Sequence, residues 1–172
     1  KKIFILHLYR ATDKVDHGIL IDYKKIKINN FDNINTLYYK IGLASAELTI
    51  KNFKNFTKKT YLKKTPKRKE SFFRKITQKD DFINWKNSTD KIFNLIKACQ
   101  KPYPVAKTLL NNKILFINNA YPFDYFFKKK IKPGTILSIF PNKNFLIKTD
   151  DGSILVTEYS YNRKIIEGLV CK

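Results

Sequence analysis

The stretch "AKTLLNNKILFINN", residues 106–119, carries the strongest fold signal in the sequence. Two short apolar runs, 106–110 and 113–119, are separated by Asn111 and Asn112, a residue pair typical of turns between strands. Further strands, bounded by the turn signals "KPG", "PNKN" and "DDG", are expected over residues 135–140, 144–149 and 153–159. Short strands at this spacing predict a small β-sandwich or β-barrel in this part of the chain.

A helix is expected just before these strands. Asn87 or Ser88 can cap its N-terminus, and "KPYP", residues 101–104, ends it because proline cannot continue a helix. The apolar residues between these limits follow helical spacing, at Ile92, Phe93, Leu95, Ile96 and Cys99.

Two strands and a second helix are expected in the first part of the chain. Apolar residues favour strands over 3–9 and 18–28, and Asp32 or Asn33 can cap a helix over about 34–56. Apolar positions in that helix recur at helical spacing, at Leu37, Ile41, Ala44 and Leu48. The predicted architecture is therefore an α/β part followed by a β-barrel-like module with a leading helix.

The net charge is +21, from 35 basic against 14 acidic residues. Only four of the basic residues are arginines, and Lys, Asn, Ile, Phe and Tyr are abundant together, which indicates AT-rich codon usage. We therefore interpret most of the positive charge as a solvated surface, and the remainder as evidence for an anionic partner. Residues 51–79 hold twelve basic residues and one acid, Glu70. This stretch is predicted to be a surface linker, or an anion-binding strip interleaved with Tyr61, Phe72 and Phe73.

Composition argues against several functional classes. No apolar stretch approaches the ~20 residues of a membrane span, and no signal peptide begins the chain, so a cytoplasmic protein is expected. Cys99 and Cys171 have no metal-ligand spacing, and with only two histidines we predict no metal site. Five glycines are too few for a P-loop or a dinucleotide-binding motif.

Methionine is absent even at position 1, which predicts the C-terminal part of a longer protein or a processed piece.

The segment "RATDKVDHGILID", residues 10–22, contains the best candidate for a catalytic side chain. Asp16 stands two residues before Gly18, in the connection between the two expected strands. Asp-x-Gly is a frequent turn sequence. Local physics alone therefore favours a structural role for Asp16 over a catalytic one.

Several segments, in collinear order, resemble the formyltransferase family that uses 10-formyltetrahydrofolate. "VDHGIL", after an apolar strand, is similar to the Asp-x-Gly segment that delivers an aspartate to the active site of those enzymes. "KIKINNFDNINTLYYKI" is similar to the strand and helix opening that follow. "DFINW", "IFNLIKACQKPYPVAKTLLNNKILFINNAY", "KPGTIL" and "FLIKTDDGSILVTEY" are similar to segments of the C-terminal part. The sequence departs from the family where Val105 replaces a glycine and Lys97 an arginine.

The resemblance implies a fold and an activity. Residues 1–56 would be the C-terminal portion of a Rossmann-like formyltransferase catalytic domain, 57–84 a basic linker, and 85–172 an OB-like β-barrel domain with a leading helix. The activity implied is transfer of a formyl group from 10-formyltetrahydrofolate to an amine, with no metal. Asp16 matches the catalytic aspartate, which orients a histidine and favours its charged form. The loop that lines the family's folate pocket matches the backbone of Thr12, Asp13, Lys14 and Val15.

The family's catalytic histidine lies in an Asn-x-His motif that this chain lacks. Neither His7 nor His17 matches it, and His17 is expected to be an exposed turn residue. The resemblance therefore implies a missing partner, the N-terminal half of the catalytic domain. We expect residues 1–172 alone not to transfer formyl groups.

Two acceptors fit the resemblance, and a function without catalysis is also open. "PYP" and "RKITQKDDFINW" favour an amino sugar carried on a nucleotide, the leading hypothesis, because Thr77 and Asp80 keep part of the sugar enzymes' pattern. The basic charge favours methionyl-tRNA instead. In the third hypothesis the OB-like module binds single-stranded nucleic acid through exposed aromatic side chains. The candidates, which could equally fill the barrel core, are Tyr103, Tyr121, Phe123, Tyr125 and Phe127.

Overall fold

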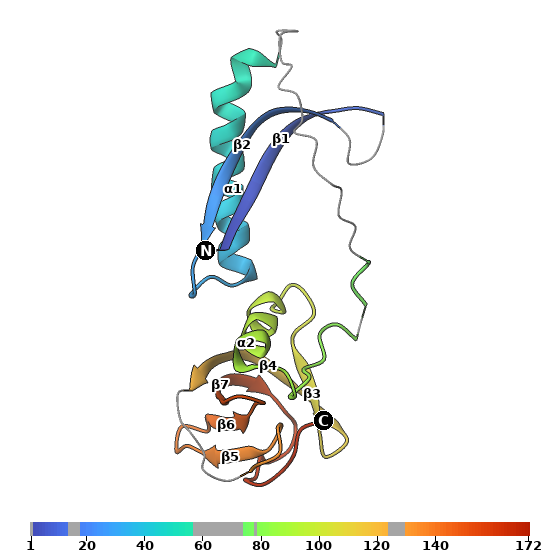
Figure 1. The fold of residues 1–172 in the computed structure, drawn as a ribbon, viewed down its shortest axis with the longest axis vertical. Coiled ribbons are helices and arrows are strands. Elements are labelled where there is room, and N and C mark those ends of the chain that lie inside the picture. The colour runs from blue at the N-terminus through green and yellow to red at the C-terminus, as the bar shows by residue number, and fades with distance from the viewer. Residues whose placement is uncertain (1, 14–17, 57–73, 78, 124–129) are drawn as a thin grey trace. The chain divides into compact units, whose positions relative to one another are not determined.

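The computed structural model describes residues 2–13, 18–56, 74–77, 79–123 and 130–172 (Figure 1). The chain divides into two compact units, Lys1–Arg74 and Lys75–Lys172. Some residues singled out from the sequence lie outside the described ranges, namely Lys14, Val15, Asp16, His17, Tyr61, Phe72, Phe73, Tyr125 and Phe127.

The described residues of the first unit form a two-stranded antiparallel hairpin and one long helix, as the sequence predicts (Figure 1). Strand β1 (Lys2–Ala11) pairs with β2 (Gly18–Ile28), and α1 (Ile34–Asn52) packs against both strands. The α-helix ends four residues before its predicted end, and a short 3₁₀ helix, η1 (Phe53–Asn55), follows it.

Asn33, one of the two predicted caps, begins α1. Its side chain accepts a hydrogen bond from the backbone N–H of Thr36, and the Thr36 hydroxyl accepts one from the backbone N–H of Asn33, both at 3.0 Å. The two residues therefore form a capping box. Asp32, the other predicted cap, is buried and instead accepts a hydrogen bond from Lys40 Nζ at 2.6 Å.

A buried carboxylate joins β2 to the end of α1. Asp22 is 8% exposed and accepts hydrogen bonds from Lys51 Nζ (2.9 Å), Asn52 Nδ2 (3.1 Å) and the backbone N–H of Tyr23 (2.9 Å). The hydrogen bonds from Lys51 and Asn52 lower the pKa of Asp22 to about 2. The carboxylate is therefore charged at neutral pH and holds the helix on the hairpin.

Acid is expected to weaken this connection. The folded-state pKa of Asp22 lies below its ordinary value of 3.8, so its stabilising contribution is complete above about pH 4 and is lost as the pH falls towards about 2. The loss should be about 1–2 kcal/mol, because Lys51 is exposed and solvent screens the pair. Urea unfolding from about pH 5 to pH 2 should show this loss in the wild-type chain and in Asp13→Asn, which removes an exposed carboxylate of the same unit. An equal pH dependence in Asp22→Asn would contradict the assignment.

In the second unit, the described residues form one helix and a five-stranded antiparallel sheet that curls into a half-barrel (Figure 1). Helix α2 (Thr89–Ala98) precedes the strands, whose order in the sheet is β3-β4-β7-β6-β5. The strands are β3 (Lys107–Leu110), β4 (Lys113–Phe123), β5 (Ile136–Ile139), β6 (Phe145–Lys148) and β7 (Ser153–Ser160). The five predicted strands and the helix before them are confirmed, whereas the OB-like topology remains a prediction.

The asparagine pair forms the predicted turn between β3 and β4. Leu110 pairs with Lys113, and Asn111 and Asn112 between them have positive φ angles of 48° and 58°. Two consecutive left-handed residues are typical of a type I′ turn, whose twist matches that of the flanking strands. Asparagine tolerates this conformation better than most residues, which explains the signal in the sequence.

The core of the second unit lies between α2 and the inner face of the sheet. Ile92 and Ile96 of α2 are buried against apolar side chains from all five strands. These side chains include Leu110, Leu115, Ile117, Ile136, Phe145, Ile147, Ile154 and Val156. Trp85, from the segment before α2, belongs to the same core, and its indole N–H donates to Thr108 Oγ1 at 2.9 Å.

A residue from a distant turn caps α2. Ser88 occupies one of the two predicted N-cap positions, but its side chain makes no capping hydrogen bond. Instead Asp151, in the turn between β6 and β7, accepts hydrogen bonds from the backbone N–H (2.7 Å) and the hydroxyl (2.8 Å) of Thr89. The hydrogen bond from the Thr89 backbone lowers the pKa of Asp151. A charged carboxylate therefore stands at the positive end of the helix dipole.

The last residues of the chain connect both edges of the sheet. Lys172 exchanges backbone hydrogen bonds with Leu109 of β3, at 3.1 and 2.8 Å. At the other edge, the backbone N–H of Gly168 donates to the carbonyl of Ile136 in β5, whose own N–H donates to the carbonyl of Leu169. Since β3 and β5 are the edge strands, residues 168–172 cover hydrogen-bonding groups that an open sheet would expose.

The end of the predicted linker packs on the second unit. The backbone N–H of Ile83 donates to the carbonyl of Lys107 (2.8 Å), and the N–H of Lys107 donates to the carbonyl of Asp81 (2.9 Å). This part of the predicted linker, 57–84, therefore lies along strand β3. The boundaries of the linker (57–84) and of the two domains (1–56 and 85–172) remain predictions.

Candidate functional site

The predicted catalytic region is the six-residue connection between β1 and β2. Thr12 and Asp13, two of the four residues predicted to line a folate pocket, are exposed where β1 ends. The other residues of the connection, 14–17, include the candidate catalytic Asp16 and lie outside the described residues. The catalytic and folate-binding assignments therefore stay predictions.

The glycine of the Asp-x-Gly segment is required by strand packing. A Cβ atom at Gly18 would lie 2.7 Å from the carbonyl oxygen of Arg10 and 3.1 Å from Cβ of Tyr9. Close to this point the register of the hairpin shifts, because Leu8 pairs with Asp22 but Tyr9 with Leu20. Only glycine allows the two strands to approach this closely beside an irregularity. The close packing against Arg10 and Tyr9 therefore accounts for the glycine of this segment.

His7 lies in the middle of β1 among aromatic side chains. Its ring centroid is 5.5 Å from that of Tyr9 and 6.4 Å from that of Tyr23, its partner on β2. All three side chains are exposed. This environment is typical of packing on a strand surface.

The two cysteines are poor nucleophiles in this fold. Burial, and then the nearby charges of Asp81 and Asp80, raise the pKa of Cys99, and burial raises the pKa of Cys171 to about 12. Both thiols are therefore protonated at neutral pH.

Within the described ranges, no three His, Cys, Asp or Glu side chains gather as a metal site would require. In the same ranges, no helix is long and apolar enough to cross a membrane.

A buried ion pair that sequence reasoning missed anchors the segment before α2. Asp81 is 5% exposed, and its Oδ2 lies 2.9 Å from Lys107 Nζ, which also stands 4.8 Å from the ring centroid of Phe82. In the described part of the chain, the second oxygen of Asp81 has no hydrogen-bond partner. The two residues are 26 positions apart in the sequence. The local sequence around Asp81, two acids followed by apolar residues, does not indicate that Asp81 pairs with Lys107.

The aromatic side chains proposed for nucleic-acid binding lie outside the core where the structure describes them. Tyr103 and Tyr121 are exposed and Phe123 is half-buried, and none of them belongs to the core cluster. Tyr121 packs beside Phe93 of α2, with ring centroids 6.4 Å apart. The alternative in which these side chains fill the barrel is therefore wrong for these three residues.

The second unit corresponds to a known domain. Residues 75–169 match the family described as "Formyl transferase, C-terminal domain". The chain belongs to the formyltransferase family. The match covers more than half of the chain, so the family suggested by the sequence motifs is confirmed.

Relatives in the formyltransferase family match nearly the whole chain. The methionyl-tRNA formyltransferase of Prochlorococcus marinus (strain MIT 9215) is 31% identical over 176 residues, which cover 92% of this chain and 53% of the relative. The chain thus spans about half the length of that relative.

Two solved structures share the fold. HypX from Aquifex aeolicus, in complex with tetrahydrofolic acid, superposes with a TM-score of 0.69 at 22% identity, over 94% of this chain and 28% of that one. The N-formyltransferase from Helicobacter canadensis, solved with folinic acid and dTDP-3-aminofucose, superposes with a TM-score of 0.65 at 21% identity, over 92% of this chain and 56% of that one.

Proposed function

We propose that this chain serves the transfer of a formyl group from 10-formyltetrahydrofolate to the amine of methionyl-tRNA. The observation that carries the proposal is the 31% identity with a methionyl-tRNA formyltransferase over 92% of the chain. The net charge of +21 agrees with an RNA acceptor, since lysines and arginines neutralise phosphates.

The chemistry assigned to this chain rests on the connection between β1 and β2. Asp16 would orient a histidine from an Asn-x-His segment and favour its charged form, so that the histidine can take a proton from the attacking amine. The folate would supply the formyl carbon. Thr12 and Asp13, with Lys14 and Val15, would offer backbone groups to the folate, and the exposure of Thr12 and Asp13 fits this role.

The surface of the first unit supports a further part of the catalytic domain. A two-stranded hairpin is at best marginally stable by itself, and here one helix packs against it. Large apolar side chains remain exposed on it, including Phe31 (91%), Ile50 (76%), Tyr39 (71%) and Phe53 (70%). We propose that the half of the catalytic domain carrying the Asn-x-His segment covers part of this surface.

A nucleotide-linked amino sugar is the second candidate acceptor. Its support is the segment "TQKDDFINW", in which the backbone N–H and the hydroxyl of Thr77 donate to Asp80 Oδ2, at 2.6 and 3.0 Å. These two residues keep part of the pattern of the sugar enzymes.

Competing acceptors test the proposal. The assay uses either one polypeptide that contains this chain and an Asn-x-His segment, or this chain together with a second polypeptide that carries the segment. The protein receives 10-formyltetrahydrofolate and either methionyl-tRNA or dTDP-3-aminofucose. We expect formylation of methionyl-tRNA, no formylation of the sugar, and no reaction with residues 1–172 alone. Formylation of the sugar alone would establish the second candidate, and turnover by residues 1–172 would refute the need for a second half.

A further inference from the structure

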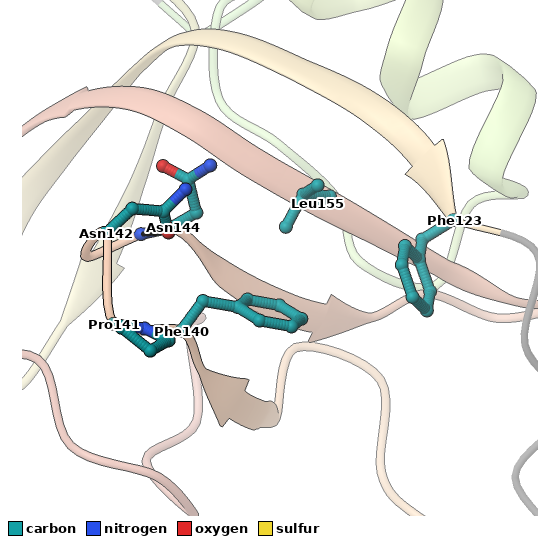
Figure 2. A pocket seen from close by; sticks show the side chains of 6 residues that line it. All are labelled: Phe123, Phe140, Pro141, Asn142, Asn144 and Leu155. Atoms are coloured by element: carbon teal, nitrogen blue, oxygen red, sulfur yellow. Dashed lines mark hydrogen bonds between the residues drawn. The ribbon is translucent and has the colours of Figure 1, made fainter.

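The second unit has a hollow of its own, lined only by residues of that unit. It has a volume of about 360 Å³, towards the lower end of the range of small-ligand sites. Side chains from the ends of β4 and β5, from the β5–β6 turn and from β7 line it, namely Phe123, Phe140, Pro141, Asn142, Asn144 and Leu155 (Figure 2). We call it the Phe123–Phe140 pocket.

Two aromatic rings form the apolar part of this pocket. Figure 2 shows the rings of Phe123 and Phe140 pointing into the same hollow, with Leu155 of β7 beside them. None of these three residues belongs to the core cluster. On β7, Leu155 alternates with Ile154 and Val156, which are fully buried in the core. The pocket therefore lies on the face of the sheet opposite the core.

Two amide side chains form the polar rim of the Phe123–Phe140 pocket. Asn142 Oδ1 accepts a hydrogen bond from the backbone N–H of Asn144 at 3.1 Å, and the carbonyl of Asn144 accepts one from the N–H of Phe140 at 2.8 Å. Lys143 between them has a φ of 67°, in the left-handed region. Both asparagines line the pocket, so amide groups stand beside the aromatic rings.

The net charge of the second unit favours an anionic ligand. Residues 75–172 contain 17 lysines and arginines and 8 acidic residues, a net charge of +9. Lys143, an exposed lysine, stands in the sequence between the two rim asparagines. Flat apolar rings, amides that can pair with a base edge, and adjacent positive charge are together the features by which proteins hold single-stranded nucleic acid.

We propose that the Phe123–Phe140 pocket binds one unpaired base of a single-stranded RNA segment. The base stacks on Phe140 or Phe123, the amides of Asn142 and Asn144 hydrogen-bond its edge, and Lys143 pairs with the neighbouring phosphate. The proposal depends only on residues of the second unit and does not require formyl transfer. It assigns a binding role to Phe123, one of the aromatic residues singled out from the sequence.

The test uses the 172-residue chain and a seven-nucleotide uridine RNA whose central base is replaced by 2-aminopurine. This base is fluorescent, and stacking quenches its fluorescence. We expect binding with quenching in the wild-type chain. Phe140→Leu, which keeps an apolar side chain but removes the ring, should weaken binding roughly 5- to 150-fold and abolish quenching. Phe116→Leu is the matched control, because Phe116 is 38% exposed on β4 and does not line the pocket. It should behave as the wild type.

A second variant separates stacking from charge. Lys143→Ala should lower the slope of log Kd against log salt by about one and leave the quenching of the bound base intact. Unchanged affinity and quenching in both Phe140→Leu and Phe123→Leu would overturn the proposal, since binding would then rest on charge alone. Equal affinity for free 2-aminopurine ribonucleotide and for the heptamer would also overturn it, because the site would then hold a nucleotide and not an RNA chain. Absence of RNA binding would overturn it outright.

Discussion

Replacing Asp16 by asparagine is expected to lower kcat for formyl transfer by about 10²- to 10⁴-fold, in the assembly that includes an Asn-x-His segment. Asparagine keeps the size of the side chain but loses the charge that favours a protonated histidine. Binding of the folate should change little, because the contacts assigned to residues 12–15 use the backbone. The effect should therefore fall on kcat and leave KM for the folate nearly constant.

The pH dependence distinguishes this role from a structural one. Since the Asp16 carboxylate would raise the pKa of the histidine, Asp16→Asn should move the acidic limb of the kcat profile to lower pH. Glu158→Gln, which neutralises an exposed carboxylate on β7, serves as the control and should keep wild-type kcat and pH profile. If Asp16→Asn only lowers stability and retains kcat, Asp16 is a turn residue.

Replacing Trp85 by alanine is expected to destabilise the second unit by about 3–5 kcal/mol. The indole is 4% exposed, belongs to the core and donates to Thr108 Oγ1. It also lies against Gly134, where a Cβ atom would stand 3.3 Å from the indole ring. Loss of the side chain would leave a large cavity and remove a hydrogen bond from a fully buried threonine, both of which are costly.

The measurement is urea unfolding followed by near-ultraviolet circular dichroism. Trp85→Phe should cost less than Trp85→Ala, because phenylalanine fills most of the cavity but cannot donate to Thr108. Ile166→Ala, at a position 54% exposed, is the control and should change stability by less than about 0.5 kcal/mol. A cost below about 1 kcal/mol for Trp85→Ala would show that this side chain does not hold the core together.

The elements of this chain were predictable because their signals are local. The "NN" turn at Asn111 and Asn112 needs only two residues with positive φ, and the capping box needs only Asn33 and Thr36. The five strands of the second unit alternate or run apolar between turn residues, so their existence followed from the sequence. For the candidate site, "VDHG" was recognisable as a motif, yet the close strand contact that requires Gly18 depends on a register shift in the hairpin.

The contacts that join elements were not predictable in the same way. Asp151 caps a helix that begins 62 residues earlier, at Thr89, and Asp81 pairs with Lys107 on a strand. Serine before a helix is a good local cap, but a carboxylate brought in by tertiary structure can take its place. The Phe123–Phe140 pocket likewise exists only because residues of β4, of β7 and of the β5–β6 turn lie together on one side of the sheet.

The backbone exchange between Leu109 and Lys172 has a consequence for folding kinetics. These partners are 63 residues apart, so closing the contact costs more chain entropy than any of the hairpin turns. During synthesis, both edge strands are made before residues 168–172. New chains therefore pass through a stage with two unpaired strand edges, when they are most prone to aggregate. A lower temperature weakens the association of apolar surfaces and should raise the yield of soluble protein.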